Sequence, residues 1–467
     1  MATPQEPANV LDPDPIVDRS LKHSIRDGVY YSAMIGTAEN YFSAFAVFLK
    51  ATTTQVGVLA SLPPLLASFS QVISAWLGRR LRKRKEIIVG GALLQAFSLI
   101  PLMALPMWYP DLALPLVIVF AVIYFIGPNL GSPQWGSLMG DLVHESRRGR
   151  FFALRTRLSS LANFTALGLA GLILHLFAGW EMTYWGFVAI FTLASIFRLL
   201  SAWHLSKMFD PPGHVAAINT GLGGLWQVYR ESGLLRFTAF FACMQLSVAI
   251  ASPYFALYML RDLEFSYLGF MFNTAASVCV QFLTLNRWGR LSDLFGNRLI
   301  LATTGFIIPV MPVLWMFSTD YVYLLVVQAI SGLAWAGFTL SAGNMVYDLT
   351  PRDHRVTLMA VHGVVAATGT FIGALIGAWL GNNLPNEITF DGEVFSWLTP
   401  LYGVFLISGI ARLITVSAFL RKLEEVRRVR PMSRAGLIFR VTRVAPLSGL
   451  IFEVVGRSDK GEDPPEK

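Results

Sequence analysis

Twelve long apolar stretches, separated by short polar segments, constrain this chain more than any other feature of its sequence. A helix needs about 20 apolar residues to cross the hydrocarbon core of a bilayer, and it satisfies its own backbone hydrogen bonds there. Only 14% of the residues are charged, whereas soluble domains carry roughly 25%. We therefore predict an all-α membrane protein with twelve transmembrane helices. The predicted spans are 27–49, 53–77, 87–108, 113–136, 158–179, 183–204, 237–260, 266–286, 299–318, 321–346, 357–381 and 397–420.

The basic residues predict how these spans are oriented. All but four of the 37 Lys and Arg fall on the side of the two termini when the chain is threaded through the spans. Cytoplasmic loops carry this excess, so we expect both termini in the cytoplasm of a multi-pass plasma-membrane protein, the inner membrane in a bacterium. The net charge of +8 is spread over short runs between apolar segments, which fits membrane topology and predicts no nucleic-acid partner. The polar first 22 residues predict no cleavable signal peptide.

The two halves of the chain resemble each other. Several polar residues of the first half recur about 210 residues later, and the order of apolar runs repeats with them. Duplicated six-helix halves are a common build of transporters, with the substrate site between the halves near the midplane. The recurring pairs are Gly136 and Gly343, Asp141 and Asp348, Arg148 and Arg355, and Arg198 and Arg412.

This repeat predicts five regions. They are an N-terminal cytoplasmic tail at 1–22, a six-helix bundle at 23–205, a cytoplasmic linker at 206–236, a second six-helix bundle at 237–420 and a basic cytoplasmic tail at 421–467. The last region is either an amphipathic helix on the inner leaflet or a solvated tail. The bundles are expected to be related by pseudo-symmetry.

The loop after the eighth span carries the most specific local pattern. Gly289, Asp293, Gly296 and Arg298 stand at each fixed position of Gly-x-x-x-Asp-x-x-Gly-x-Arg. This loop resembles the signature loop of the major facilitator superfamily. The first copy, after the second span, departs from the pattern: it keeps Gly78 but has Arg82 at the acidic position and Lys85 at the second glycine.

The segment after the fourth span is similar to the family's loop between spans 4 and 5, through Asp141 and Arg148. The resemblance implies the major facilitator fold, secondary transport and a gating role for these two loops. The alternative for Asp293 is an ordinary loop anchor.

Glu39 is the sharpest single candidate. It lies midway along the first span, where an ionisable group costs several kcal/mol. Ser32, Gly36, Asn40 and Ser43 share its helical face by their spacing of three and four. We expect this face to meet a cavity or another helix. Glu39 is then either a proton-coupling residue or a static partner in a hydrogen bond or ion pair.

Other polar side chains mark the faces of spans that line the cavity in the family. Each is either a substrate contact or a hydrogen bond between helices. The substrate-cavity candidates are Asn40, Asn129, Gln245, Asn273, Gln281, Gln328 and Trp335. Arg198 and Arg412, inside spans 6 and 12, either bind an anion or serve structure, and their symmetry favours structure.

Together these patterns predict a secondary active transporter of a small solute that works by alternating access and is coupled to an ion. Proton symport is favoured over antiport because span 5 lacks the glycine–proline signature of many exporters in the family. The sequence contains no motif of a metal site, a nucleotide-binding loop or an enzyme, so we expect no cofactor and no catalysis. We expect a monomer. The alternative is a receptor or scaffold on the same fold that does not transport.

Overall fold

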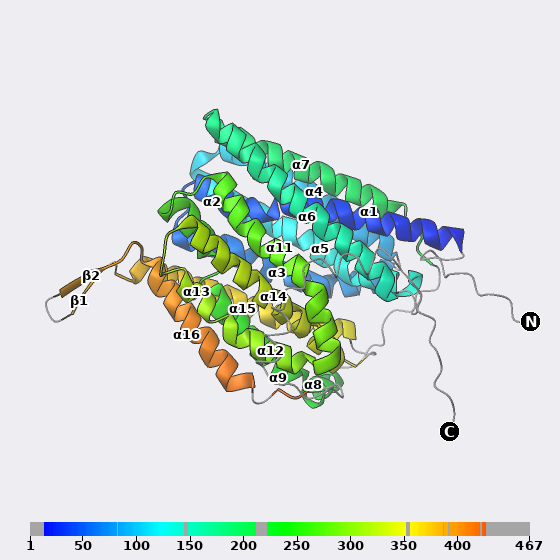
Figure 1. Cartoon of the computed structure of the whole chain (residues 1–467). Helices are drawn as coiled ribbons and strands as arrows, with labels where there is room; N and C mark the ends of the chain where they lie inside the picture. The colour runs from blue at the N-terminus through cyan, green and yellow to red at the C-terminus, as the bar shows by residue number, and fades with distance from the viewer. Residues whose placement is uncertain are drawn as a thin grey trace, which may run out of the picture.

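The computed structural model describes residues 14–81, 83–143, 148–211, 222–351, 355–385, 387–390, 393–420 and 423–425. Apart from one hairpin, its regular elements in these residues are helical (Figure 1). The long helices are α1 (Pro15–Thr37), α3 (Thr53–Leu81), α4 (Arg84–Trp108), α5 (Ala113–Leu142), α6 (Arg148–Gly179), α7 (Thr183–Ser206), α9 (Leu234–Ala249), α11 (Tyr267–Phe295), α12 (Asn297–Ile307), α14 (Tyr321–Leu349), α15 (Arg355–Asn383) and α16 (Leu401–Phe419). The short elements are η1 (Glu39–Tyr41), α2 (Phe42–Phe48), η2 (Pro110–Leu112), α8 (Leu222–Glu231), α10 (Tyr254–Leu257), the π-helical turn η4 (Tyr258–Asp262), α13 (Val310–Leu314), β1 (Glu387–Phe390) and β2 (Glu393–Ser396).

The helices form two groups that follow the two halves of the sequence (Figure 1). In the first half, α4 packs on α5 and α7, and α1 packs on α6 and α7. In the second half, α11 packs on α14 and α9 packs on α15 and α16. The halves join through α3 against α15 and α6 against α11. This is the pseudo-symmetric arrangement of two helical bundles that the sequence repeat predicts.

We call the face where α1 begins and α7 ends the near face, and the opposite one the far face. The antiparallel hairpin of β1 and β2 lies at the far face, with Glu387 opposite Ser396 (Figure 1). The sequence analysis did not predict it. The predicted linker at 206–236 likewise contains a helix, α8. The region 421–467 lies outside the described residues except for 423–425.

Eleven helical segments in the described residues are long and apolar enough to cross a membrane. The first predicted span, 27–49, is absent from this set. The prediction that it forms one continuous helix was wrong, because the helix is interrupted between Thr37 and Phe42. Its helix begins earlier, at Pro15, where the side chain of Asp14 accepts a hydrogen bond from the Ile16 N–H and caps the first turn. It ends at Thr37, and α2 resumes only at Phe42. The first turns of α1 are charged, and α2 beyond the break has only seven residues.

A second break lies at the matching place in the second half. Helix α9 ends at Ala249 and α10 begins at Tyr254, where Pro253 supplies no N–H to continue the helix. In each half a tyrosine beside the break donates its hydroxyl to a backbone carbonyl of a neighbouring long helix. Tyr41 donates to Leu167 O at 2.8 Å on α6, and Tyr254 donates to Ala374 O at 2.5 Å on α15. The internal repeat therefore extends to the breaks and their anchors.

A row of glycines on α15 lets it approach α9 closely. A Cβ placed on Gly369, Gly373 or Gly377 would lie 2.5, 2.1 and 2.1 Å from carbonyl oxygens of α9 and the residue that follows it. Only glycine allows this backbone contact, as in other closely packed membrane helices. The row therefore holds the second half together.

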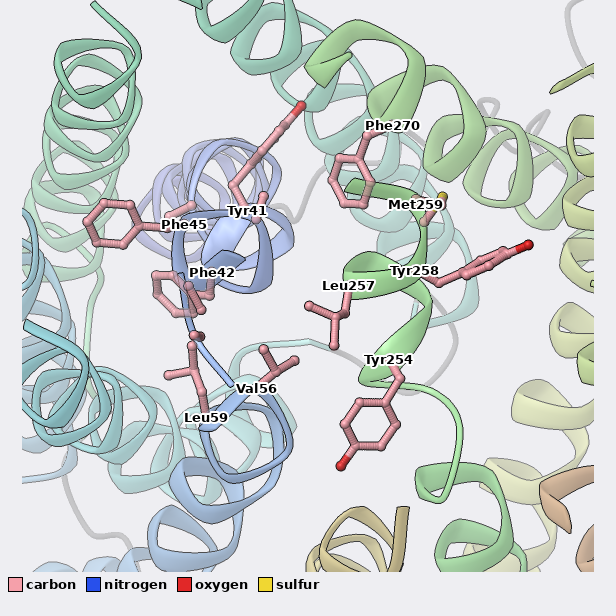
Figure 2. Close-up of a cluster of buried hydrophobic side chains, with 14 of the residues drawn as sticks. Tyr41, Phe42, Phe45, Val56, Leu59, Tyr254, Leu257, Tyr258, Met259 and Phe270 are labelled. Atoms are coloured by element: carbon pink, nitrogen blue, oxygen red, sulfur yellow. The ribbon is translucent and has the colours of Figure 1, made fainter. Parts of the chain in front are cut away.

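The buried side chains show where the two halves are sealed. The largest cluster, at the far face, combines residues of both halves, including Phe42 and Leu59 from the first and Leu257 and Phe270 from the second (Figure 2). The clusters at the near face each belong to one half: one surrounds Leu21 and the others come from the second half. In the described residues, buried apolar packing between the halves is thus concentrated at the far face.

Candidate coupling site and substrate pathway

The far-face seal is built from the broken helices. Figure 2 shows Leu257 of α10 pointing toward Val56 of α3, between the halves. The two are fully buried, with exposed fractions of 0%. On the same side Gly57 meets Tyr254 so closely that a Cβ on Gly57 would lie 2.3 Å from the tyrosine hydroxyl. Solute cannot pass a layer packed in this way, so the far face is closed.

Glu39 lies in the break of the first span, just before Tyr41 of the seal. Its carboxylate accepts a hydrogen bond from the hydroxyl of Tyr124 on α5 at 3.3 Å. In the described part of the chain no basic side chain forms an ion pair with it. The tyrosine also contacts the sulfur of Met34 on α1, at 2.8 Å. Glu39 is therefore a half-buried carboxylate with one hydroxyl donor.

The sequence analysis placed Glu39 on a continuous polar helical face, and the structure does not support that face. The helix ends before Glu39, and Gly36 packs against the backbone of α6, where a Cβ would lie 2.5 Å from Asn163 O. Asn40 turns back and donates to the carbonyl of Ile35 at 3.3 Å, so its side chain satisfies a carbonyl near the broken end. The polar residues here stabilise a helix interruption, which is where many transporters bind substrate and ions.

A buried charge network lies closer to the near face within the first half. Asp27 of α1 pairs with Arg155 of α6 at 3.1 Å and accepts a hydrogen bond from Ser201 of α7 at 2.7 Å. Ser201 accepts from Arg198 at 2.6 Å, and the Arg198 guanidinium lies 4.7 Å from the ring centre of Tyr31. The network thus crosses three helices of one bundle.

Sequence reasoning missed Asp27 and Arg155, although both were visible as charges in or beside predicted spans. Asp27 stands at the first residue of span 1, and Arg155 lies three residues before span 5. A buried ion pair needs a partner from another helix, which neither spacing nor hydropathy identifies.

Arg412, the repeat counterpart of Arg198, has different partners. Its guanidinium donates to Ser408 Oγ at 3.1 Å, to Ile308 O at 3.4 Å and to Val248 O at 3.3 Å. The two carbonyls lie where α12 and α9 end, and cations stabilise helix C-termini. Arg412 therefore holds two interrupted helices in place, which agrees with the structural interpretation of this residue.

The remaining cavity candidates lie on several helices, and among the described residues none of them is hydrogen-bonded to another candidate. Asn129 accepts from Gln71 of α3 at 2.7 Å, and Gln281 donates to Ser277 at 3.4 Å on its own helix. Trp335 packs edge-on against Phe338 at 5.6 Å between ring centres. Gln245 and Gln328 are half-buried.

Asn273 differs from the other candidates. Its side chain is fully buried on α11, and neither its amide oxygen nor its nitrogen has a hydrogen-bond partner in the described residues. An amide that is buried without partners is costly, and such groups often meet a ligand or water.

The signature loop after α11 makes a tight turn at the near face. Gly296 has φ +86° and ψ 159°, a conformation open essentially to glycine, and the N–H of Arg298 donates to Glu425 Oε2 at 2.8 Å. Gly289 lies within the last turns of α11, in ordinary contact with Leu340. The side chain of Asp293 lies outside the described residues.

In the first half, Arg84 contacts the Asp141 identified from the sequence. Its guanidinium pairs with Asp141 at 2.6 Å and with Asp210 at 2.6 Å, while only 3% of its side chain is exposed. It ties the start of α4 to the end of α5 and to the segment after α7. The sequence analysis named Arg82 and Lys85 in this loop and missed Arg84. Arg148 begins α6, and its side chain lies outside the described residues.

Comparisons with known proteins agree on one family. The family model described as Major Facilitator Superfamily matches residues 29–284 and 237–456. A curated relative, the major facilitator-type transporter psiT2 of Psilocybe cyanescens, is 28% identical over 130 residues, which are 27% of this chain and 24% of that protein. The match thus spans about a quarter of the relative's length.

Three solved structures share the fold. A mutant of the nucleoside transporter NupG superposes with a TM-score of 0.67 at 14% identity, covering 86% of this chain and 100% of NupG. A POT family peptide transporter in an auto-inhibited form gives 0.64 at 13% identity, covering 89% and 99%. A bacterial homologue of the iron transporter ferroportin, inward-facing, gives 0.62 at 16% identity, covering 86% and 98%.

Proposed function

We propose that this chain, which belongs to the major facilitator superfamily, carries a small solute across the membrane by alternating access. It acts as a multi-pass membrane transporter rather than an enzyme, and it couples the movement of the solute to a proton. Transport of this kind requires one face to close while the other gives access to the site between the halves. The finer parts of the proposal, which are the coupling ion, the route and the substrate, rest on the following observations.

The observation that carries alternating access is the one-sided seal. The far-face cluster joins both halves through Val56, Leu59 and Leu257, whereas each near-face cluster belongs to one half. Two rigid bundles joined at one end can rock about that joint. The bundles 23–205 and 237–420 are the proposed moving bodies, and a monomer contains both.

The excess of Lys and Arg on the near face supports a cytoplasmic location for this face and for both termini. The conformation described here is then inward-facing. Asp293 and Arg148 are proposed to belong to the gating loops at this face, together with Gly289, Gly296, Arg298 and Asp141.

Glu39 supports proton coupling. Its carboxylate lies at the helix break with one hydroxyl donor, Tyr124, and with no ion-pair partner in the described residues. A carboxylate that alternates between a closed interior and water can take up a proton on one side and release it on the other. Symport is the direction favoured here, and an imposed gradient of either sign tests it.

The substrate class is approached from side-chain chemistry. The unpartnered amide of Asn273 and the half-buried Gln245 and Gln328 offer both donors and acceptors, which suits a polar solute with hydrogen-bonding groups. The solved structures of similar fold are named as nucleoside, peptide and iron transporters, and they define a practical panel of nucleosides, short peptides and iron ions.

The test is transport in proteoliposomes that contain the purified full chain. Each radiolabelled member of the panel is offered with a pH difference imposed in either direction, after a thermal-shift screen for binding. We expect accumulation against the solute gradient for a polar organic solute. Glu39→Gln should abolish accumulation and spare exchange of solute down its own gradient, whereas Glu181→Gln, at an exposed far-face glutamate, should match the parent.

Two outcomes contradict the proposal. If Glu39→Gln accumulates solute as the parent does, the proton is carried elsewhere. If a bound solute is neither accumulated nor exchanged, the chain is a receptor or scaffold on a transporter fold.

A further inference from the structure

The start of α1 carries a row of basic side chains at the near face. Arg19, Lys22 and Arg26 are exposed, and they follow one another at spacings of three and four residues along a regular helix. His23 lies on the same helical face, because side chains three and four residues apart are neighbours on a helix. Lys22 pairs with Asp18 at 2.7 Å. Arg19 and Arg26 form no ion pair within the part of the chain that the structure describes, so two cations of this row are unneutralised.

Helix α7 ends beside this row and adds a further cation (Figure 1). His23 Nδ1 lies 2.9 Å from Nδ1 of His204 on α7, and the ring of His23 meets Trp203 edge-on at 6.3 Å between ring centres. The ammonium group of Lys207 lies 5.9 Å from the centre of the same indole ring. One imidazole nitrogen of the pair has to donate and the other to accept, so at least one ring is neutral. The histidine pair therefore joins the two helix ends and brings Lys207 to the same surface as the α1 row.

The exposed face of α7 shows at which depth of the membrane this surface lies. Four exposed side chains follow one another along it at spacings of four and three residues, namely Ile196, Leu200, Trp203 and Lys207. The first two are apolar, as expected of side chains that face lipid tails. Tryptophan is enriched where the lipid tails meet the headgroups, and Lys207 lies one turn further toward the near face. The α1 row, which contacts Trp203 through His23, is therefore at the level of the lipid headgroups.

We propose that this surface binds the headgroup of an anionic phospholipid of the near-face leaflet, with its phosphate held by Arg19, Arg26 and Lys207. Phosphate oxygens accept charge-assisted hydrogen bonds from guanidinium and ammonium groups, and basic clusters beside a membrane span attract anionic lipids. A phospholipid fits this surface better than a soluble phosphate does, because Trp203 and the apolar face of α7 continue it toward the acyl chains. The bound lipid bridges α1 and α7, and the site is independent of which solute the protein carries.

The experiment is native mass spectrometry of the purified full chain in detergent with added lipid. Phosphatidylglycerol and phosphatidylcholine are titrated in turn with the same acyl chains, so that only the headgroup differs. We expect the anionic phosphatidylglycerol to bind more tightly. In the triple variant Arg19→Gln, Arg26→Gln and Lys207→Gln, its affinity should fall about fivefold for each cation removed, or about 100-fold in all. The affinity for phosphatidylcholine should change much less.

A matched control removes the same charge from the same face. The control variant replaces three exposed arginines of the second half by glutamine, namely Arg230, Arg236 and Arg290. It should keep most of its affinity for phosphatidylglycerol. The charge-conserving variant Arg19→Lys with Arg26→Lys should likewise stay closer to the parent than the triple glutamine variant does. An equal loss in the control and in the triple variant would overturn the proposal, because the lipid would then follow the total charge of the near face.

Two further outcomes also overturn it. Phosphatidylcholine may not match phosphatidylglycerol in affinity for the parent, since equal binding means that the anionic headgroup is not recognised. Inorganic phosphate that binds as tightly as phosphatidylglycerol would assign the surface to a soluble anion. Thermal unfolding checks that each variant is folded. If the triple variant is not, Lys207→Gln alone decides: it should bind phosphatidylglycerol about fivefold more weakly, and unchanged affinity refutes the site.

Discussion

The closeness of Gly57 to Tyr254 makes the far-face seal open to a direct test. These two residues belong to different halves, and a methyl group on Gly57 would lie 2.3 Å from the tyrosine hydroxyl. In Gly57→Ala the phenol has to move away from α3, which breaks its hydrogen bond to Ala374 O. The substitution therefore penalises the closed far face and leaves states with separated halves unaffected.

The penalty can be estimated from two contributions. The lost hydrogen bond costs about 1 kcal/mol, and overpacking of a tight contact costs about 1–3 kcal/mol. The sum is about 2–4 kcal/mol, and since about 1.4 kcal/mol is a tenfold change, the balance between far-closed and far-open states should shift by about 30-fold or more. In Tyr254→Phe the hydroxyl is absent, and the next contacts of a Cβ on Gly57 are Ala374 O at 3.2 Å and the ring carbon Cζ at 3.3 Å. Gly57→Ala made in the Tyr254→Phe variant should therefore shift the balance between far-closed and far-open states much less.

The assay follows a thiol inside the seal. Val56→Cys, in a chain whose two natural cysteines are replaced, is exposed to a membrane-impermeant maleimide from the far side of oriented proteoliposomes. Gly57→Ala should accelerate labelling, and Gly90→Ala, where an added Cβ meets nothing within 4 Å, should not. Equal labelling of Gly57→Ala and the parent would refute the view that this contact holds the far face closed.

Three further predictions concern stability. Asp27→Asn breaks a buried pair and should lower the free energy of unfolding by about 3–5 kcal/mol, measured by denaturant titration. Asp262→Asn removes a pair whose arginine, Arg261, is 43% exposed, and it should cost at most about 1 kcal/mol. Gly296→Ala places a Cβ in a strained conformation and should cost about 1–3 kcal/mol, whereas Gly289→Ala has ordinary contacts and should be better tolerated. Burial lowers the pKa of His23, and nearby basic residues lower it further. The unfolded chain therefore binds this proton more readily than the folded one, so the free energy of unfolding should fall as pH drops below 6.5. His23→Gln should weaken that pH dependence in thermal unfolding scans.

Most spans could be predicted because lipid leaves the backbone few choices. Apolar length alone located the segments that became α3 to α7, and the repeat of Arg198 as Arg412 correctly indicated two bundles of the same design. Hydropathy identifies segments that are surrounded by lipid, and every membrane span meets the same apolar surroundings. The roles of residues on the interior faces were harder to predict, because a polar residue gives the same sequence pattern whether it contacts a ligand or another helix.

The break in the first span shows where sequence reasoning stops. The residues from Ala38 to Tyr41 contain no proline or glycine, so the helical spacing continues through them without a signal. The break depends on partners from other parts of the chain, above all the Tyr41 bond to Leu167 O of α6. The pairing of Arg84 with Asp210 has the same character, since 126 residues separate them and no local pattern links them.

The two halves are alike in architecture and unlike in charge. Both interrupt their first helix, anchor the break with a tyrosine and bury an arginine in their last helix. In the second half that arginine, Arg412, donates to carbonyls at the ends of interrupted helices. In the first half the guanidinium faces Tyr31 and donates to Ser201, which in turn donates to Asp27, so this arginine belongs to a network of charged side chains. The carboxylate Glu39 stands two residues before Tyr41 of the seal, whereas the break between Ala249 and Tyr254 in the second half contains no acidic residue. The two halves therefore share an architecture, and the charged side chains near the break belong to the first half.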